Sequence, residues 1–386
     1  MTEAFAVALA CRACGRPARS PCAWRCDCGE PFRLLTAEEA ERVRLDDLPV
    51  PDLGHGDTPL IPSPAHDSGD VYLKLEGANP SGSFKDRGMA VLVGLALASG
   101  ASEVICDSSG NAAAAVAAFA AAASLRCRVF VPEATSETKV RQVRAYGAEL
   151  VRVPGDRETA ARAAQAAAEN ALSAADDGRA AAESAPAAAT GPQAAAQTTF
   201  YASHYWHPFF ALGTRSFALE VVEQLGGRLP DHVVFPVGHG SLYLGAVDGF
   251  LSAARRLGMP APHCHVVQSE AVHSVVAAVV GRAGAGARWS QATTLAEGIR
   301  ISRPLRLEEI AAALAATRGT ALTVSEDAIA DHWRRTARRG VLMEPTSAVA
   351  FAGYERLRSE GVIAEGATVV IPVTGSGLKS LSAESA

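Results

Sequence analysis

The sequence has no surplus of positive charge. Its 386 residues include 36 Lys and Arg against 41 Asp and Glu, which gives a formal net charge of -5. Proteins that bind nucleic acid by neutralising phosphates usually carry a broad basic surface, and this charge balance does not provide one. We therefore expect small-molecule chemistry and no nucleic-acid partner.

Targeting and membrane signals are also missing. Residues 1–10 contain one acidic residue and no Lys or Arg, unlike the start of a secretory signal or of a transit peptide. The alanine-rich stretches are interrupted by charged residues or glycine, so no apolar run approaches the length of a membrane-spanning helix. We expect a cytoplasmic protein without a membrane partner.

Short β-branched runs alternate with longer alanine-rich segments from Val71 onward. This alternation is typical of strand–helix units on a parallel sheet, and 48% hydrophobic residues suffice for two packed domains. We therefore predict an α/β fold with two parallel-sheet domains and ligands at the carboxyl ends of the strands. The predicted strands are Val71 to Leu75, Glu103 to Cys106, Cys127 to Val131, Val233 to Val237, His263 to Gln268 and Thr368 to Val373.

The segment from Asp156 to Thr199 is dominated by alanine and has few large apolar residues. We predict a helix up to about Leu172 and then a flexible insertion at about 173–199, because helix breakers accumulate in the second half. One long surface helix is the alternative, and the prolines at positions 186 and 192 argue against it.

Five of the eight cysteines fall within the first 28 residues. Cys11 and Cys14 form one close pair and Cys26 and Cys28 another, so four thiolates could bind a tetrahedral zinc ion. Cys22 could be a fifth ligand or a replacement. A disulfide or free thiols are the alternatives, which a reducing cytoplasm makes less favourable. We predict a structural zinc site at Cys11, Cys14, Cys26 and Cys28.

Lys85 lies where a turn-rich segment, Asn79 to Gly88, leads into an apolar helix expected from Met89 to Ala98. The N-terminus of a helix carries unsatisfied N–H groups and positive potential, which favour a nearby anion and disfavour a second positive charge. A neutral amine can attack an aldehyde and hold pyridoxal phosphate as a Schiff base. For a lone lysine the alternative is a solvated side chain at a surface turn.

Asn79 to Gly88 resembles the lysine motif of the threonine synthases, a family of the tryptophan-synthase-β type (fold type II) of pyridoxal-phosphate enzymes. The resemblance extends over most of the chain, from about Gly56 to Lys379. Each motif is weak alone, but together and in this order they are highly specific. The further matching segments are Gly56 to Leu60, Ser108 to Ala113, His204 to Glu220, Glu297 to Arg300 and Thr374 to Lys379.

The resemblance implies a large cofactor-binding domain with a smaller domain inserted into it, after a short zinc-ribbon-like segment. We assign residues 1–36 to the ribbon-like segment, residues 37–88 and 200–386 to the large domain, and residues 89–199 to the small domain. The resemblance also implies a homodimer.

The resemblance implies that Lys85 binds the cofactor covalently and is the catalytic base. Asn111 would bind the phenolic oxygen of the cofactor, and Thr374 would donate to its ring nitrogen. The phosphate would lie at a glycine-rich turn formed by Gly238, His239, Gly240, Ser241 and Leu242. Each motif also has a simpler interpretation, as a helix N-cap, a hydroxyl-rich loop or a tight turn.

Ser83, Ser108 and Ser109 match positions that hold the substrate carboxylate in the family, although they could equally be turn formers. The basic residues His204, His207, Arg215 and Arg300 are weaker candidates for an anionic substrate tail. We leave them outside the predicted site.

The resemblance implies conversion of O-phosphohomoserine and water to threonine and phosphate. Asp86 fits the synthase pattern, whereas dehydratases of this fold commonly have another residue there. A serine or threonine dehydratase, and a related enzyme acting on another amino acid by elimination or replacement, remain alternatives. A zinc-ribbon binding module on an inactive fold is the non-enzyme alternative.

Overall fold

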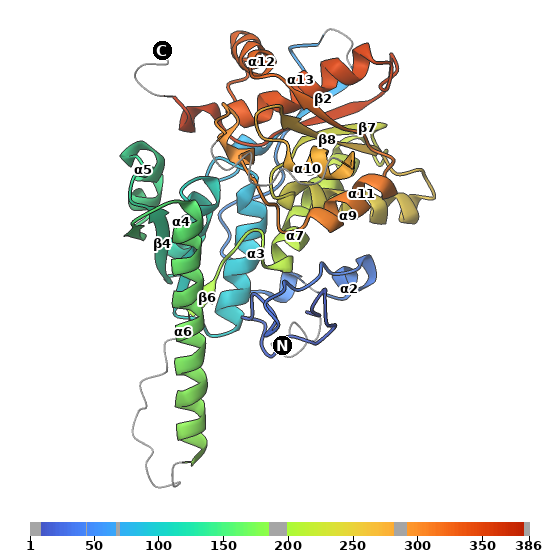
Figure 1. Cartoon of the computed structure of the whole chain (residues 1–386). Helices are drawn as coiled ribbons and strands as arrows, with labels where there is room; N and C mark the ends of the chain where they lie inside the picture. Colours follow the sequence, from blue (N-terminus) through green and yellow to red (C-terminus); the bar gives the residue numbers. More distant parts are fainter. Residues whose placement is uncertain (1–8, 44, 67–69, 185–198, 282–291, 382–386) are drawn as a thin grey trace. The chain divides into compact units, whose positions relative to one another are not determined.

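A computed structural model describes residues 9–43, 45–66, 70–184, 199–281 and 292–381 of the chain (Figure 1). The chain forms two compact units. Unit 1 comprises Met1–Leu53 and Met89–Phe209, and unit 2 comprises Gly54–Gly88 and Phe210–Ala386. This division differs from our sequence-based boundaries for residues 37–53 and 200–209, which group with unit 1.

Unit 2 is built on a six-stranded sheet in the order β1-β2-β10-β7-β8-β9. Strand β1 is antiparallel to β2, and all other neighbouring pairs are parallel. The central strands are buried along most of their length, as expected for a parallel sheet covered on both faces. The strands are β1 (Leu60–Pro62), β2 (Val71–Leu75), β7 (His232–Pro236), β8 (His263–Ser269), β9 (Ala321–Val324) and β10 (Val369–Val373).

Helix α13 (Pro345–Ser359) packs on this sheet, and its small and aromatic side chains form one core with β2, β8 and β10. Proline at its first position suits a helix start, where no backbone N–H is needed. Further helices of unit 2 within the described residues are η2 (Glu76–Ala78), α8 (Ser216–Gln224), α9 (Ser241–Leu257), α10 (Ser274–Val279), η4 (Glu297–Ile299), α11 (Leu307–Ala316), α12 (Glu326–Arg338) and η5 (Gly377–Lys379).

Unit 1 contains a four-stranded parallel sheet in the order β5-β4-β3-β6. Helix α4 (Asn111–Ala122) is almost entirely alanine and is buried over most of its length, so small side chains allow close packing against the sheet. The strands are β3 (Glu103–Cys106), β4 (Arg126–Pro132), β5 (Glu149–Val153) and β6 (Thr199–Tyr201). Further helices in the described part of unit 1 are α2 (Ala37–Arg42), η1 (Leu45–Asp47), α5 (Glu137–Ala145) and α6 (Arg157–Ser184).

Two helices contain residues of both units. Helix α3 (Lys85–Ala98) begins in unit 2 and continues in unit 1, and α7 (Pro208–Thr214) begins in unit 1 and continues in unit 2. The prediction of an α/β fold with parallel sheets is confirmed, and each predicted strand lies within one residue of an observed strand or inside it.

Helix α6 corrects one sequence-based prediction. It continues to Ser184, beyond the end that we expected near Leu172, and in Figure 1 its second half extends past the sheet of unit 1. Alanine has the highest helix propensity, so a run of alanines tolerates one glycine at a cost of about 1 kcal/mol. The remainder of the predicted insertion, residues 185–198, lies outside the described residues.

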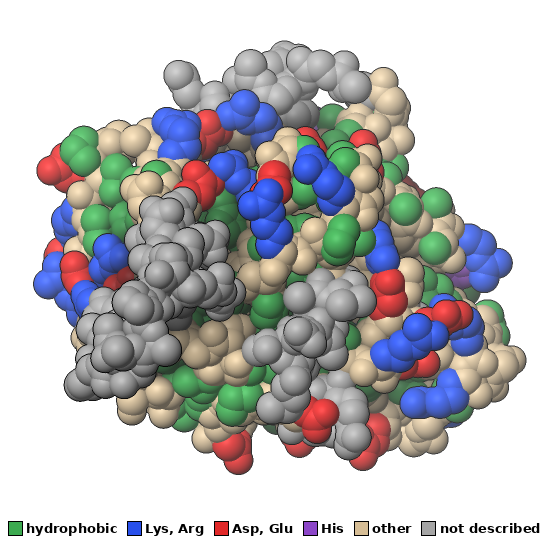
Figure 2. Space-filling model, turned by 90° about the horizontal axis from the view of Figure 1, so that it is seen from below, with side chains coloured by type: hydrophobic (Ala, Val, Ile, Leu, Met, Phe, Trp, Pro, Cys, Tyr) green, Lys and Arg blue, Asp and Glu red, His purple; other side chains and the backbone are tan. Residues whose placement is uncertain are grey.

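Among the helices in the described ranges, none combines the length and apolar character needed to cross a bilayer. On the face seen in Figure 2, acidic and basic side chains are intermixed, in keeping with the small net charge.

Candidate active site

The turn before Lys85 is pinned to the loop that follows β10. Strands β2 and β10 are parallel neighbours, so the segments after them emerge side by side. The N–H of Phe84 donates to the carbonyl of Thr374 (3.1 Å), and the N–H of Ser376 donates to the carbonyl of Gly82 (2.9 Å). Gly82 has φ +86°, a conformation that suits glycine. These bonds fix the backbone one residue before Lys85.

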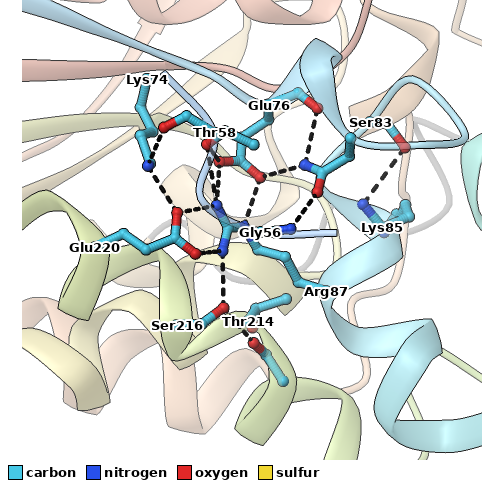
Figure 3. Close-up of polar contacts among 12 residues, drawn as sticks. Gly56, Thr58, Lys74, Glu76, Ser83, Lys85, Arg87, Thr214, Ser216 and Glu220 are labelled. Carbon is cyan, nitrogen blue, oxygen red and sulfur yellow. Dashed lines mark hydrogen bonds and ion pairs between the residues drawn. The ribbon is translucent and has the colours of Figure 1, made fainter. Parts of the chain in front are cut away.

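Lys85 is the first residue of α3, and its amine reaches the start of α9. Its Nζ donates to the Oγ of Ser241 at 3.1 Å. The same Nζ lies 4.5 Å from the ring centroid of Phe84 and 5.4 Å from that of Phe210. One amine is thus held between two aromatic faces and the hydroxyl at a helix N-terminus. The backbone N–H of Lys85 donates to the Oγ of Ser83 at 3.4 Å (Figure 3).

The glycine-rich turn after β7 leads directly into α9 and requires glycine at two positions. A Cβ at Gly238 would lie 2.9 Å from the Cα of Ile299, and one at Gly240 would lie 2.6 Å from the Cδ1 of Ile310. Gly240 also has φ +78°. Because Gly240 has no side chain to cap α9, the first N–H groups of this 17-residue helix remain available to an anion. This turn and the nearby amine therefore fit a phosphate-bearing aldehyde.

Thr374 follows β10 and is buried against the start of α13. Its Oγ1 lies 3.0 Å from the Oγ of Ser347, which also accepts the N–H of Thr374 at 2.9 Å. Two bonds to one serine fix both the backbone and the side chain of Thr374. Sequence reasoning missed Ser347, although the preceding proline marks the start of a helix.

Arg87, two residues after Lys85, is the centre of a buried charge network that sequence reasoning also missed (Figure 3). Its Nε donates to Glu76 (2.7 Å), and its Nη atoms donate to Glu76 and Glu220 at 2.5–2.8 Å. Further bonds reach the hydroxyls of Ser216 (2.8 Å) and Thr58 (3.1 Å). Every N–H of the guanidinium therefore has an acceptor, and η2, α3 and α8 are tied together.

Lys74 completes this network from the end of β2. Its Nζ donates to the carbonyl of Thr58 (2.6 Å), to Glu220 (2.7 Å) and to Gln224 (2.8 Å). Burial lowers the pKa of Lys74, and the hydrogen bond to Glu220 opposes that shift. Burial alone would raise the pKa of Glu220, but hydrogen bonds from Arg87 and Lys74 lower it to about 2. Glu220 is therefore charged at neutral pH, and its ion pair with Lys74 favours the charged amine.

Asp86 stabilises the turn before Lys85 through hydrogen bonds to Ser81. Its carboxylate accepts the N–H of Ser81 at 2.7 Å and the hydroxyl of Ser81 at 2.5 Å. Lys379 donates to the carbonyl of Ser81 at 2.8 Å. Burial raises the pKa of Asp86 to about 6 in spite of the two bonds from Ser81. Asp86 thus acts on the shape of the turn that presents Lys85.

The predicted residues Ser108, Ser109 and Asn111 lie in unit 1, directly after β3. The Oγ of Ser108 accepts the N–H of Gly110 at 3.3 Å, which shapes the turn. Gly110 is the N-cap residue of α4, and Asn111 is already inside the helix. The interpretation of Asn111 as an N-cap is therefore wrong.

The four predicted zinc ligands converge in unit 1. The Sγ of Cys28 lies 3.5 Å from that of Cys11 and 3.7 Å from that of Cys14, and Cys14 and Cys26 are 3.6 Å apart. All four Sγ atoms lie within 4.8 Å of one another, whereas Cys22 is outside this group. A tetrahedral zinc site with Zn–S bonds of about 2.3 Å has sulfur atoms about 3.8 Å apart, so this thiol cluster fits the ion.

The cysteines are free thiols, and a hydrogen bond from Arg16 lowers the pKa of Cys14 to about 6.

Among the weaker basic candidates, His207 contacts the carbonyl of Pro21 (3.2 Å) and Arg215 pairs with Asp248 (3.0 Å). Both contacts suit structural roles.

The model of the family described as pyridoxal-phosphate dependent enzyme matches residues 51–375. A curated threonine synthase from Halalkalibacterium halodurans is 31% identical over 339 residues, which cover 86% of this chain and 86% of that protein. Threonine synthase from Methanocaldococcus jannaschii is 29% identical over 385 residues, covering 92% and 88%. Threonine synthase from Synechocystis is 31% identical over 370 residues, covering 94% and 85%.

Solved structures share the fold at low sequence identity. A fungal L-serine ammonia-lyase from Rhizomucor miehei has a TM-score of 0.64 at 21% identity, over 83% of this chain and 94% of that chain. O-ureido-L-serine synthase has a TM-score of 0.65 at 20% identity, over 88% and 92%. At this level of identity, the likeness concerns architecture alone.

Proposed function

Because the chain belongs to the threonine synthase family of pyridoxal-phosphate dependent enzymes, we propose that it converts O-phosphohomoserine and water to threonine and phosphate. One observation carries the proposal beyond family membership: the amine of Lys85 lies 3.1 Å from Ser241, at the uncapped start of α9. A covalent anchor for an aldehyde and a phosphate cradle therefore lie together within unit 2.

Lys85 would hold pyridoxal phosphate covalently, and the turn Gly238 to Leu242, His239 included, would bind its phosphate. Thr374 would face the ring nitrogen, and Asn111 would bind the phenolic oxygen. When bound, the cofactor supplies an electron sink for the carbon that loses its proton. The hydroxyl of Thr374 would donate a hydrogen bond to the ring nitrogen and keep its own proton. The ring nitrogen would then stay unprotonated, which favours elimination and replacement over transamination.

Lys85 would remove the α proton of the substrate and return protons at later steps. The rings of Phe84 and Phe210 limit the positions open to its amine on two sides. The hydroxyls of Ser83, Ser108 and Ser109 would hold the substrate carboxylate. Positioning of this kind is a large part of catalysis, because it removes the need to orient the reacting groups during the reaction.

We further propose that the thiol cluster of Cys11, Cys14, Cys26 and Cys28 binds a structural zinc ion. The spacing of the sulfur atoms supports this assignment, and the left-handed glycines Gly15 and Gly29 support the two tight turns after the cysteine pairs. A homodimer in the cytoplasm completes the proposal.

To test this function, the purified protein is incubated separately with O-phosphohomoserine, serine and threonine, and phosphate, threonine and keto acid are measured. We expect equal amounts of phosphate and threonine from O-phosphohomoserine. Keto acid formed from serine or threonine, without phosphate release from O-phosphohomoserine, would identify a dehydratase and overturn the proposal.

The anchor is tested by borohydride reduction and peptide mapping. The chain contains only four lysines, at positions 74, 85, 139 and 379, so the modified peptide is unambiguous. We expect the label on Lys85 and the loss of visible absorbance in Lys85→Ala. Lys139→Ala, an exposed lysine on α5, is the matched control and should keep both. A label at any other lysine would refute the assignment.

A further inference from the structure

The thiol cluster encloses a short loop whose only tryptophan is deeply buried. Trp24 lies between the two cysteine pairs and is 2% exposed. Its ring meets Tyr201 edge-on at 5.1 Å and Trp206 at 4.9 Å, and Arg25 stacks over its face at 4.6 Å. The loop is thus fastened at both ends by cysteines and in its middle by an aromatic stack.

Two more contacts fasten this loop within unit 1. The ring of His207 contacts the carbonyl of Pro21 at 3.2 Å. Arg25 forms an ion pair with Glu169 on α6. The loop therefore packs against the segment that follows β6 and against α6.

The segment after β6 in turn contacts the segment after β3. These strands are parallel neighbours, and the N–H of Ala202 donates to the carbonyl of Ile105 at 2.9 Å. The hydroxyl of Tyr205 donates to the carboxylate of Asp107 at 2.7 Å. Asp107 directly precedes Ser108, so Tyr205 and Asp107 connect the aromatic stack to the loop that contains Ser108, Ser109 and Asn111.

We propose that Trp24 is a positioning residue, which transmits the order of the thiol cluster to the loop Asp107–Asn111. Zinc at the cluster keeps the enclosed loop in one conformation. Trp24 packs on Trp206, whose ring centroid lies 6.4 Å from that of Tyr205, and through Trp206 it holds Tyr205 where it can bind Asp107. Loss of the metal frees the loop, the aromatic stack loosens and the Asp107–Asn111 loop becomes mobile. The effect on substrate affinity rests on the proposed function, but the effect on mobility does not.

Hydrogen–deuterium exchange measured by mass spectrometry tests the mobility directly. The protein is compared with zinc, after chelation and after zinc is restored, in peptides that cover residues 103–112, 199–209 and 366–377. We expect exchange to accelerate by about tenfold or more in the first two peptides on chelation, to recover with zinc, and to remain unchanged in the third, which belongs to unit 2.

Variants separate the tryptophan from the metal. Trp24→Leu keeps all four thiols and should accelerate exchange at 103–112 with zinc still bound, whereas Trp24→Phe should restore most of the protection. Cys14→Ser should behave like the chelated protein. Cys22→Ser, in the same segment but outside the cluster, is its matched control and should behave like the parent protein.

Unchanged exchange at 103–112 in Trp24→Leu would overturn the proposal. Faster exchange in all three peptides would also overturn it, because that result means general destabilisation. In kinetic assays, Trp24→Leu should raise KM by about fivefold or more, with a smaller change in kcat and an unaltered cofactor absorbance. Absence of threonine synthase activity in the parent protein would refute the proposed function, and the exchange experiment would still decide the role of Trp24.

Discussion

Replacing Lys74 with methionine should destabilise the protein strongly, because it leaves a buried network with an unbalanced charge. Lys74 and Arg87 carry two positive charges, and Glu76 and Glu220 carry two negative charges, so the native network is neutral. The side chains of Lys74, Arg87 and Glu76 are 0% exposed and that of Glu220 is 11% exposed, so water cannot compensate for a lost partner.

Removing one partner of a buried ion pair typically costs about 3–5 kcal/mol, and we expect Lys74→Met to lose that much stability. The double variant Lys74→Met with Glu220→Gln leaves Arg87 and Glu76, and the network is neutral again. The two substitutions should therefore be non-additive, with a coupling free energy of about 1–3 kcal/mol in favour of the double variant.

Urea unfolding at pH 7, followed by far-ultraviolet circular dichroism, measures these free energies without adding salt. Lys139→Met replaces an exposed lysine by the same side chain and should change stability by about 0.5 kcal/mol or less. The reasoning is refuted if Lys74→Met loses less than about 1 kcal/mol, or if the two single effects simply add.

Ionisation of Glu220 in this network makes the free energy of unfolding depend on pH. The pKa of Glu220 is about 2 in the folded protein and 4.5 in the unfolded chain, so its stabilising effect is complete above pH 4.5 and is lost as the pH falls toward 2. The shift corresponds to about 3 kcal/mol. Glu220→Gln should remove this part of the acid sensitivity, and an unchanged slope in the variant would contradict the assignment.

Three further outcomes can be tested. Burial lowers the pKa of His232 to about 4, so as the pH falls the unfolded chain is protonated before the folded protein. Stability should therefore fall as the pH drops from about 6.5 toward 4. In thermal unfolding, His232→Gln should show a smaller loss of stability over this pH range. Gly240→Ala should weaken cofactor binding about tenfold in an absorbance titration, because the new Cβ strains the left-handed backbone and clashes with its neighbours. Gly258→Ala, at the other end of α9, is the control: its backbone is also left-handed, but the new Cβ has no atom within 4 Å, so the variant should bind the cofactor normally. Ser347→Ala removes both bonds to Thr374 and should cost about 1–2 kcal/mol in urea unfolding; an unchanged midpoint would show that Thr374 is held by other contacts.

The strands and the order of the site loops follow from sequence patterns alone. The run Val369 to Val373 is apolar throughout and Val71 to Leu75 is apolar except for Lys74, and in a parallel sheet their carboxyl ends lie at one edge. That rule already places the turn before Lys85 beside Thr374, as the backbone bonds between Phe84 and Thr374 show. The cysteine spacing likewise indicated the four thiols that converge.

Two features could not be predicted, for different physical reasons. The length of α6 depends on how many alanines offset one glycine and two adjacent aspartates, and periodicity does not measure that balance. The buried charges were missed because Lys, Arg and Glu are normally exposed, so each alone indicates a surface position. One signal was present: Lys74 interrupts an otherwise apolar strand, where both faces of the sheet are covered.

The buried network explains how a flexible lysine can have a defined position. A lysine side chain has four rotatable bonds, so the direction of its amine depends on the backbone from which it starts. Arg87 fixes the first turn of α3 from one side, and Asp86 fixes the preceding turn from the other. On this hydrogen-bonded backbone, the contacts to Phe84 and Ser241 favour one orientation for Lys85. An apolar core could be as stable as these ion pairs, but it would not impose the same directional constraint on the residue two positions away.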